Sequence, residues 1–556
     1  MHPLSPTDGP ALRRPSSALR SLPLLLLALA LVLSLPVLAL LGAWLPWGQG
    51  GAQALAILRE MASTVLPGYF WTTLWLGLWV ALGAAGVGMA TAAAVTLFDF
   101  PGRRQMEWLL LLPLAMPAYV TAYAYTDFLQ FSGPLQTWLR AGFGLEGRVL
   151  PEVRSLGGAV WVFIFALYPY VYLLARTALG ERAAHLMEAA RLMGAPLSRR
   201  VRTVALPLAR PAVAAGVALV LMETLADFGV VSYFGIQTFT TGIYKAWLSM
   251  DNRLAAAQLA TMLLALVLAL LWLEQRAQRR MRFATSSTGR AGSAEAQPQR
   301  LAGWRCAGAW AVCLLPVLMG FVAPVAFMLR PLAADWSVLP WDRFVEWAAN
   351  SVRLGAITAV LAVALALALA FAVRRRADRT TRAVVRLASA GYAVPGAVIV
   401  VGLLLPVGWL QAAMPQWGIG ALVTTTAVGI VWAYLVRFCA VALQSVQSGY
   451  ARIPASFDDA ARMLGTGGWG LLRRVHWPLL RRSTAAALLL VFVDVMKELP
   501  ATIVLRPFNS DTLAVVAYQL ARDERLGEAA LPSLALVAVG LVPVILLSRT
   551  LRARGP

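Results

Sequence analysis

The sequence predicts an all-α polytopic membrane protein with about 12 transmembrane helices, arranged as two homologous six-helix halves with both termini inside. Three observations predict this fold. Of the 556 residues, 60% are hydrophobic and only 13% are charged, whereas soluble domains carry about 25% charged residues. The apolar residues gather in blocks of about 20, the length that a helix needs to cross a bilayer. In addition, one loop pattern occurs twice at a fixed separation.

The apolar blocks divide the chain into two halves joined by a polar stretch, which is typical of a flexible linker. The predicted segments are a cytoplasmic tail (1–20), a first half (21–274, with its core at about 68–274), a cytoplasmic linker (275–305), a second half (306–548, with its core at about 349–548) and a cytoplasmic tail (549–556). Pro117 and Pro395 lie inside two blocks, where neighbouring helices are expected to shield the backbone. The spans are expected at roughly 21–45, 68–97, 107–130, 157–179, 211–236 and 256–274, then 306–329, 349–373, 386–410, 418–443, 484–508 and 529–548.

The charge pattern predicts the orientation. The net charge is +22, and Lys245 and Lys497 are the only lysines. The arginines lie mostly in short loops on alternate sides, which is the pattern of the positive-inside rule, and it predicts a cytoplasmic N-terminus and C-terminus. A strongly basic soluble protein would suggest nucleic acid. Here the placement indicates contact with membrane lipid instead, and no nucleic acid partner is expected.

The N-terminus resembles a signal peptide, because Arg13, Arg14 and Arg20 precede an apolar run that continues to Leu45. The run is too long for the apolar part of a signal peptide, and further spans follow it. We therefore expect a retained first span.

No metal site or disulfide framework is predicted. Cys306, Cys313 and Cys439 lie in apolar blocks without a paired spacing, so they are expected to be small core residues. The histidines are too scattered to form a metal site; they are His2, His185 and His476.

The repeated loop pattern is the most informative feature. The first copy is Glu188-Ala189-Ala190-Arg191-Leu192-Met193-Gly194, followed by Leu206-Pro207, and the second is Asp459-Ala460-Ala461-Arg462-Met463-Leu464-Gly465, followed by Trp477-Pro478. The copies are separated by 459 − 188 = 271 residues, and the same offset relates Glu223 to Asp494 and Asp227 to Glu498. Matched residue types at one offset indicate a duplicated unit.

Each copy predicts a short docking helix. The small alanines would let another protein pack closely. Gly194 and Gly465 would end the helix, because a helix C-terminus often requires a positive φ. An ordinary amphipathic loop helix is the alternative, and the duplication at fixed spacing argues against it.

These loops resemble the EAA motif of type I ABC importer permeases, and the second copy departs mildly at Asp459 and Trp477. The resemblance implies that Glu188–Gly194 and Asp459–Gly465 form coupling helices that dock on ATPase subunits. The segments that begin at Leu112, Glu223, Lys497 and Asp511 are similar to fused ferric-iron permeases. The resemblance therefore implies a multi-pass subunit of the bacterial inner membrane, with a homodimer of ATPase subunits and a periplasmic substrate-binding protein as partners.

The chain is not expected to be an enzyme. A P-loop requires Gly before Lys, and neither lysine follows a Gly. ATP and Mg²⁺ are therefore expected on the partner ATPase, with no cofactor on this chain. The run Gly465-Thr-Gly-Gly-Trp-Gly fits a dinucleotide-binding pattern, but it follows a helix instead of a strand.

Ionisable residues within spans mark candidate pathways. Glu223 and Asp227 are four residues apart and are expected on one face of the fifth span. Asp494 and Lys497 are expected to pair, and Glu498 to share a face with Asp494. These five residues are either a cation-friendly path wall or a structural network. Arg353, Arg437 and Asp127 are instead expected near span ends.

The predicted mechanism is alternating access, in which a binding protein docks on loops 239–253 and 509–528. Three alternatives remain open. The cargo could be thiamine, a phosphonate or a polyamine. The chain could be a secondary transporter driven by an ion gradient. It could also be a membrane enzyme or scaffold, although no clustered catalytic side chains favour an enzyme.

Overall fold

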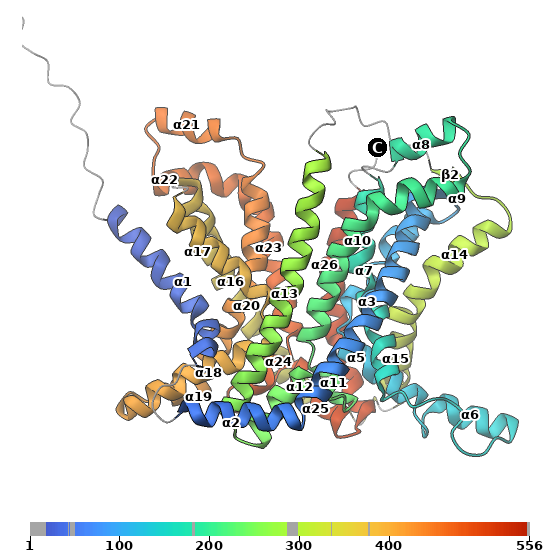
Figure 1. Cartoon of the computed structure of the whole chain (residues 1–556), viewed down its shortest axis with the longest axis horizontal. Coiled ribbons are helices and arrows are strands. Elements are labelled where there is room, and N and C mark those ends of the chain that lie inside the picture. The colour runs from blue at the N-terminus through green and yellow to red at the C-terminus, as the bar shows by residue number, and fades with distance from the viewer. Residues whose placement is uncertain are drawn as a thin grey trace, which may run out of the picture.

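Almost all regular structure in the computed structural model is helical (Figure 1). The structure describes residues 18–42, 44, 50–180, 184–285, 298–334, 336–337, 339–375 and 378–552. Most of the predicted N-terminal tail, part of the linker, the last four residues and the side chain of Glu188 lie outside the described part.

The first half contains a series of long helices joined by short helical turns. Its elements are α1 (Ala18–Gly42), α2 (Gly50–Ser63), α3 (Leu66–Leu97), β1 (Phe98–Asp99), α4 (Arg103–Leu109), η1 (Leu112–Ala115), α5 (Ala118–Leu129), α6 (Pro134–Phe143), α7 (Leu156–Ala178), α8 (Ala184–Leu192), α9 (Leu197–Arg200), η3 (Val201–Ala205), α10 (Leu206–Ala226), α11 (Gly229–Tyr233), α12 (Phe239–Tyr244), η4 (Lys245–Ser249) and α13 (Arg253–Thr285).

The second half repeats this plan. Its elements are β2 (Gln299–Arg300), α14 (Trp304–Val317), η5 (Leu318–Val322), α15 (Ala323–Ala334), α16 (Trp341–Arg375), α17 (Arg379–Ala390), η6 (Gly391–Ala393), α18 (Gly396–Ala413), η7 (Pro415–Trp417), α19 (Ile419–Thr425), α20 (Ala427–Tyr450), α21 (Ala455–Met463), α22 (Trp469–Leu471), η8 (Leu472–His476), α23 (Trp477–Lys497), α24 (Pro500–Leu505), α25 (Leu513–Arg522) and α26 (Leu526–Arg552).

The all-α polytopic fold is confirmed. Within the described residues, nine helices are long and apolar enough to cross a membrane, or ten if one bent pair counts as a span. Each of the twelve predicted spans coincides with at least one helix. Two of these helices, α1 and α23, are not among the nine; α23 carries Arg481, Arg482, Asp494 and Lys497, which lower its hydropathy. The number of segments that cross the bilayer stays a prediction.

Four predicted spans are broken instead of continuous. Pro117 and Pro395 do not lie inside helices; each precedes the first residue of the next helix, α5 or α18. A proline disfavours the helical conformation of the residue before it, and Met116 is extended. The helices before and after Pro117 make an angle of 88°. The two other breaks follow α10 and α23, at Asp227 and Glu498, which are both extended.

The duplication extends to individual turns. Adding 271 to the bounds of α8 gives those of α21, and adding it to η3, a π-helical turn, gives η8, which is also a π-helical turn. Ser155 caps α7 and Thr426 caps α20, again 271 residues apart, because each hydroxyl accepts a hydrogen bond from a backbone N–H in the first turn. The two halves therefore share one backbone plan.

The first helix of each half packs on the other half. α1 lies against α17 and α18, while α14 lies against α3 and α15 against α5. Trp432 Nε1 donates to the carbonyl of Val32 at 3.0 Å, and Tyr125 OH donates to the carbonyl of Met319 at 2.7 Å. The predicted division at 21 and 306 is therefore a division of sequence and not of packing.

The linker has more structure than expected. α13 continues to Thr285, beyond the predicted boundary at 274. β2 pairs in parallel with β1, with Phe98 opposite Gln299, and fastens the end of the linker to the end of α3.

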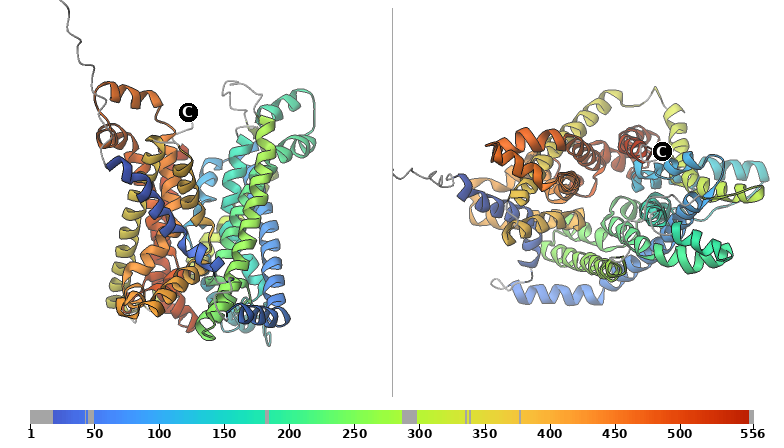
Figure 2. Two further views of the ribbon diagram at one scale, coloured as in Figure 1. Left: turned by 60° about the vertical axis from the view of Figure 1, so that its left-hand side comes forward. Right: turned by 90° about the horizontal axis from the view of Figure 1, so that it is seen from above.

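The helices define two opposite faces. α8, α21, the start of α1 and the end of α26 lie on one face, which we call the coupling face (Figure 1). α2, α11, α12, α19, α24 and α25 lie at the opposite end, which we call the far face. On the coupling face, α8 and α21 are well separated in both side views (Figure 2).

Candidate functional site

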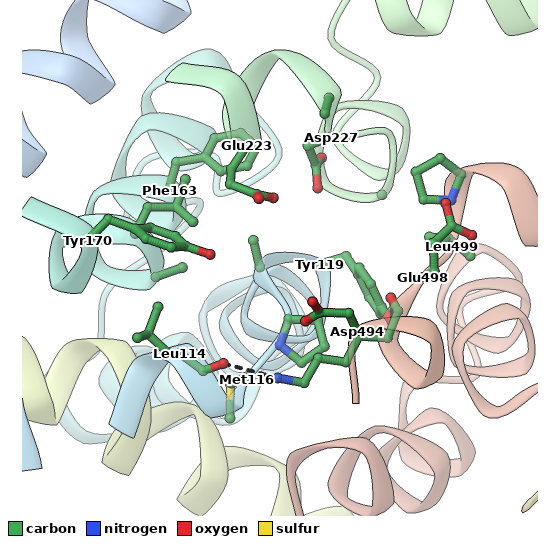
Figure 3. Close-up of a pocket in the computed structure, with 18 of the residues that line it drawn as sticks. Leu114, Met116, Tyr119, Phe163, Tyr170, Glu223, Asp227, Asp494, Glu498 and Leu499 are labelled. Atoms are coloured by element: carbon green, nitrogen blue, oxygen red, sulfur yellow. Dashed lines mark hydrogen bonds between the residues drawn. The ribbon is translucent and has the colours of Figure 1, made fainter. Parts of the chain in front are cut away.

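A cavity of about 190 Å³ lies between the two halves and contains all five predicted intramembrane residues (Figure 3). Its wall comes from η1, α5, α7 and α10 of the first half and from η6, α20 and α23 of the second. The sequence offset places Glu223 opposite Asp494, and Asp227 opposite Glu498, in equivalent positions of the two halves. The structure therefore gathers the five residues at one site.

The two first-half acids reach the cavity in different ways. Glu223 lies on α10, and its Oε1 accepts a hydrogen bond from Tyr392 OH of the other half at 3.1 Å. Asp227 follows the end of α10, and its Oδ1 accepts the N–H of Val230 at 2.8 Å. The prediction that both acids share one helical face is therefore wrong, because the helix ends between them.

The second-half residues are engaged more tightly. Glu498 follows the end of α23, and its carboxylate accepts the N–H groups of Ala501 and Thr502 at 2.9 and 3.0 Å. The expected face shared with Asp494 is wrong for the same reason as in the first half. Lys497 Nζ donates to the carbonyl of Leu114 at 3.0 Å. Among the described residues, no ion pair within 4.0 Å joins Lys497 to Asp494, so the expected direct pair is wrong.

Arg437 is the residue that the sequence analysis placed incorrectly. It lies within α20 at the cavity, not at a span end, and its Nη1 contacts Glu498 Oε1 at 3.3 Å. Its position deep inside an apolar block was the available signal. Tyr170 and Tyr392 also line the cavity, and no sequence signal separated them from other tyrosines of the spans.

The basic residues of the cavity all come from one half. The first-half positions equivalent to Arg437 and Lys497 are 437 − 271 = 166 and 497 − 271 = 226, and both are alanine. The cavity wall has four acids and two bases, so its formal charge is 2 − 4 = −2. The arrangement favours a positively charged guest, because like charge repels an anion.

The two repeated loops form equivalent helices on the coupling face. Gly194 and Gly465 follow α8 and α21 with φ of 78° and 75°. The N–H of Ala195 bonds to the carbonyl of Ala190 at 3.0 Å, and the N–H of Thr466 bonds to that of Ala461 at 2.8 Å. These are Schellman C-caps, so the prediction that glycine ends each helix is confirmed.

The tips of α8 and α21 expose matched apolar side chains. Leu192, Met193, Met463 and Leu464 are 85%, 80%, 89% and 84% exposed. Exposed apolar side chains at equivalent places are typical of a contact with another protein.

The alanines of the motif divide between two environments. Ala189 and Ala460 are exposed, while Ala190 and Ala461 are buried against the rest of the chain. Asp459 points outward, and its Oδ1 contacts Arg462 at 2.8 Å. Only one of the two alanines in each motif is therefore free for close packing with a partner.

The residue before Asp459 has a role that the motif did not indicate. Asp458 is buried and contacts Arg374 and His476. Burial raises the pKa of Asp458, but hydrogen bonds from Arg374 and His476 outweigh this, and the pKa lies below its ordinary value. The carboxylate is therefore charged at neutral pH.

The expected docking loops are mostly helices within the core. Phe239 begins α12 and Leu513 begins α25, and both side chains are buried. Only the ends of these segments are exposed, for example at Met250 and Glu524. Among the described residues, no cluster of three or more His, Cys, Asp or Glu side chains could hold a metal ion.

Comparisons with known proteins agree with the duplicated architecture. The family model for "Binding-protein-dependent transport system inner membrane component" matches residues 84–283 and 361–553, well over half of the chain. The chain is 24% identical over 484 residues to the Fe(3+)-transport system permease protein FbpB 2 of Haemophilus influenzae, covering 86% of this chain and 88% of that protein.

Two further relatives show the range of the family. The probable ABC transporter permease protein y4fN of Sinorhizobium fredii is 24% identical over 513 residues, covering 86% of this chain and 87% of that protein. The sulfate transport system permease protein CysW of Escherichia coli is 34% identical over 163 residues, covering 29% of this chain and 54% of that protein. The chain belongs to the family of binding-protein-dependent transport system inner membrane components, which are the permease subunits of ABC importers.

Proposed function

We propose that the chain imports ferric iron, and that the cavity between its halves is part of the iron path. As an ABC importer permease it is a multi-pass protein of the bacterial inner membrane, and ATP hydrolysis belongs to a separate ATPase. The observation that carries the proposed cargo is the wall of four acids and two bases around the cavity. This charge suits a cation and disfavours sulfate or a phosphonate.

The size of the cavity supports a small cargo. A volume of 190 Å³ holds about six water molecules at about 30 Å³ each. A hydrated metal ion fits this space, whereas thiamine or a polyamine is larger. The Haemophilus relative, whose name gives Fe(3+) transport, spans both halves of this chain.

Two coupling helices support two ATPase contacts of the same kind. α8 and α21 have the same length, the same C-cap and matched exposed tips. We therefore propose a homodimer of ATPase subunits that carries ATP and Mg²⁺ and binds the coupling face, which would lie in the cytoplasm. Exposed apolar residues anchor such contacts.

Contacts between the halves support alternating access with a binding protein at the far face. Ser232 Oγ lies 2.8 Å from Tyr518 OH, Arg154 contacts Glu524 at 3.3 Å, and Tyr244 OH donates to the carbonyl of Pro500. The helices that carry or adjoin these residues, α11, α12, α24 and α25, lie at the far face (Figure 1). These bonds would separate when that side opens.

Uptake of radioactive ferric iron tests the cargo. A strain that lacks this permease should regain iron uptake when the chain is restored, and should not regain uptake with Glu223→Gln at equal protein level. Labelled sulfate and 2-aminoethylphosphonate serve as controls. Restored uptake of either anion without iron uptake would contradict the proposal.

A further inference from the structure

One buried polar cluster joins the second coupling helix to three membrane helices. Asp458 lies on α21, Arg374 in the last turn of α16, Tyr450 at the end of α20 and His476 at the end of η8. Arg374 Nε and Nη2 donate to the two carboxylate oxygens of Asp458 at 2.8 and 3.3 Å. His476 Nε2 lies 3.0 Å from Asp458 Oδ1, and its Nδ1 lies 3.2 Å from Tyr450 OH.

The cluster is closed to solvent and geometrically specific. His476 is 0% exposed and Asp458 is 4% exposed. The planar guanidinium of Arg374 binds the carboxylate with two nitrogens, which fixes the orientation as well as the distance. Arg374 also donates to the carbonyl of Pro454, the residue before α21, at 3.0 Å. Removing one partner would leave a buried charge without its counter-charge, so α21 cannot shift freely against α16.

The first coupling helix has no such cluster at the equivalent positions. Subtracting 271 from 458, 476 and 450 gives Met187, Ala205 and Leu179. All three are buried and apolar. Apolar contact has no preferred direction, and methionine in particular adapts to different neighbours. The same faces of α8 and α21 are therefore attached to the membrane helices by different chemistry.

The cluster also leads to the cavity. His476 ends η8, and α23 continues directly from it to Lys497. Asp494 is 494 − 476 = 18 residues further along, which is about 27 Å at 1.5 Å per residue. A movement of α21 that His476 follows would therefore reach the cavity wall through one continuous helix.

We propose that the Arg374–Asp458–His476–Tyr450 cluster is a rigid link that transmits ATPase movement from the second coupling helix to α23, and that the first coupling helix lacks an equivalent link. Asp458 is then a positioning residue for energy coupling, distinct from the outward Asp459 of the motif. The inference rests on the proposed function of α21 as an ATPase dock. The two ATPase contacts are consequently equivalent in shape and unequal in how firmly they drive the membrane helices.

Transport stoichiometry tests this link in the complete complex of permease, ATPase and binding protein in proteoliposomes. Asp458→Asn and His476→Leu should lower the iron transported per ATP hydrolysed by at least about fivefold, the lower end of typical coupling energies. His476→Gln keeps a donor and an acceptor and should retain most of the ratio. Met187→Leu, the matched control at the first coupling helix, should leave it unchanged. An unchanged ratio in Asp458→Asn, or an equal fall in Met187→Leu, would overturn the proposal.

A second measurement does not depend on the cargo. A spin label at Met463→Cys in the full chain should become more mobile when Asp458→Asn or His476→Leu is added, while a label at Leu192→Cys should not respond. Equal label mobility with and without these substitutions would overturn the rigid link even if iron is not the cargo. Failure of wild-type iron transport with a normal label response would instead contradict the proposed cargo alone.

Discussion

The two walls of the central cavity share one backbone plan and differ in charge. In the first half, Glu223 and Asp227 face the cavity without a basic residue from their own half, because positions 166 and 226 are alanine. In the second half, the equivalent acids lie near Lys497 and Arg437. The difference indicates that duplication preserved the scaffold while the halves specialised, with the more neutral wall in the second half.

The largest expected effect comes from breaking the pair that distinguishes the second wall. Arg437→Met leaves Glu498 as a buried carboxylate without its ionic partner, although Glu498 keeps its bonds to Ala501 and Thr502. Removal of one partner from a buried pair costs about 3–5 kcal/mol. The amount of folded protein and its Tm in detergent should fall.

The double variant is the matched control for this prediction. Arg437→Met combined with Glu498→Gln removes both charges and should recover much of the lost Tm. If the single variant is as stable as the wild type, the pair does not hold the break between α23 and α24.

The next effect tests the similarity of the halves. Leu192→Asp and Met463→Asp each place a charge at an exposed helix tip, where it would be buried in an ATPase contact. Each should weaken ATPase binding by about 2 kcal/mol, a typical value for an interface anchor. Co-purification of the ATPase measures this. A loss with only one of the two variants would show that the two docks are unequal in affinity as well as in attachment.

A smaller effect separates the two acids at equivalent positions. Lys497, three residues from Asp494 on α23, partly offsets the charge of Asp494, and alanine stands at the position equivalent to Lys497 in the first half. Glu223→Gln should therefore lower iron uptake about tenfold, which corresponds to about 1.4 kcal/mol, and Asp494→Asn should lower it less. Uptake at equal protein level decides this, and a larger loss with Asp494→Asn would reverse the assignment of the walls.

Sequence reasoning found what periodicity and repetition encode. Apolar blocks located the helices, and the offset of 271 residues located α8, α21 and the acids of the cavity. It missed features that depend on packing between distant segments. α1 and α14 exchange between halves, and nothing in either helix names its neighbour.

The broken spans show the limit most clearly. Hydropathy continues through Asp227 and Glu498, so the blocks appeared unbroken, but each carboxylate caps the backbone of the following short helix. Arg437 was placed at a span end because an arginine inside a span is costly, and its partner Glu498 is 61 residues away. Asp458 had no signal, because its partners come from three other elements.

The smallest effect sharpens the contrast at a single hydrogen bond. Tyr392 of the second half donates to Glu223 of the first at 3.1 Å, so the second half also holds the first-half acid in place. Tyr392→Phe removes that bond, typically worth about 1 kcal/mol, and should raise the apparent KM for iron uptake several-fold with little change in the maximal rate. Tyr170→Phe, at another position of the same wall, is the control. Equal kinetics for both variants would show that Glu223 needs no support from the opposite half.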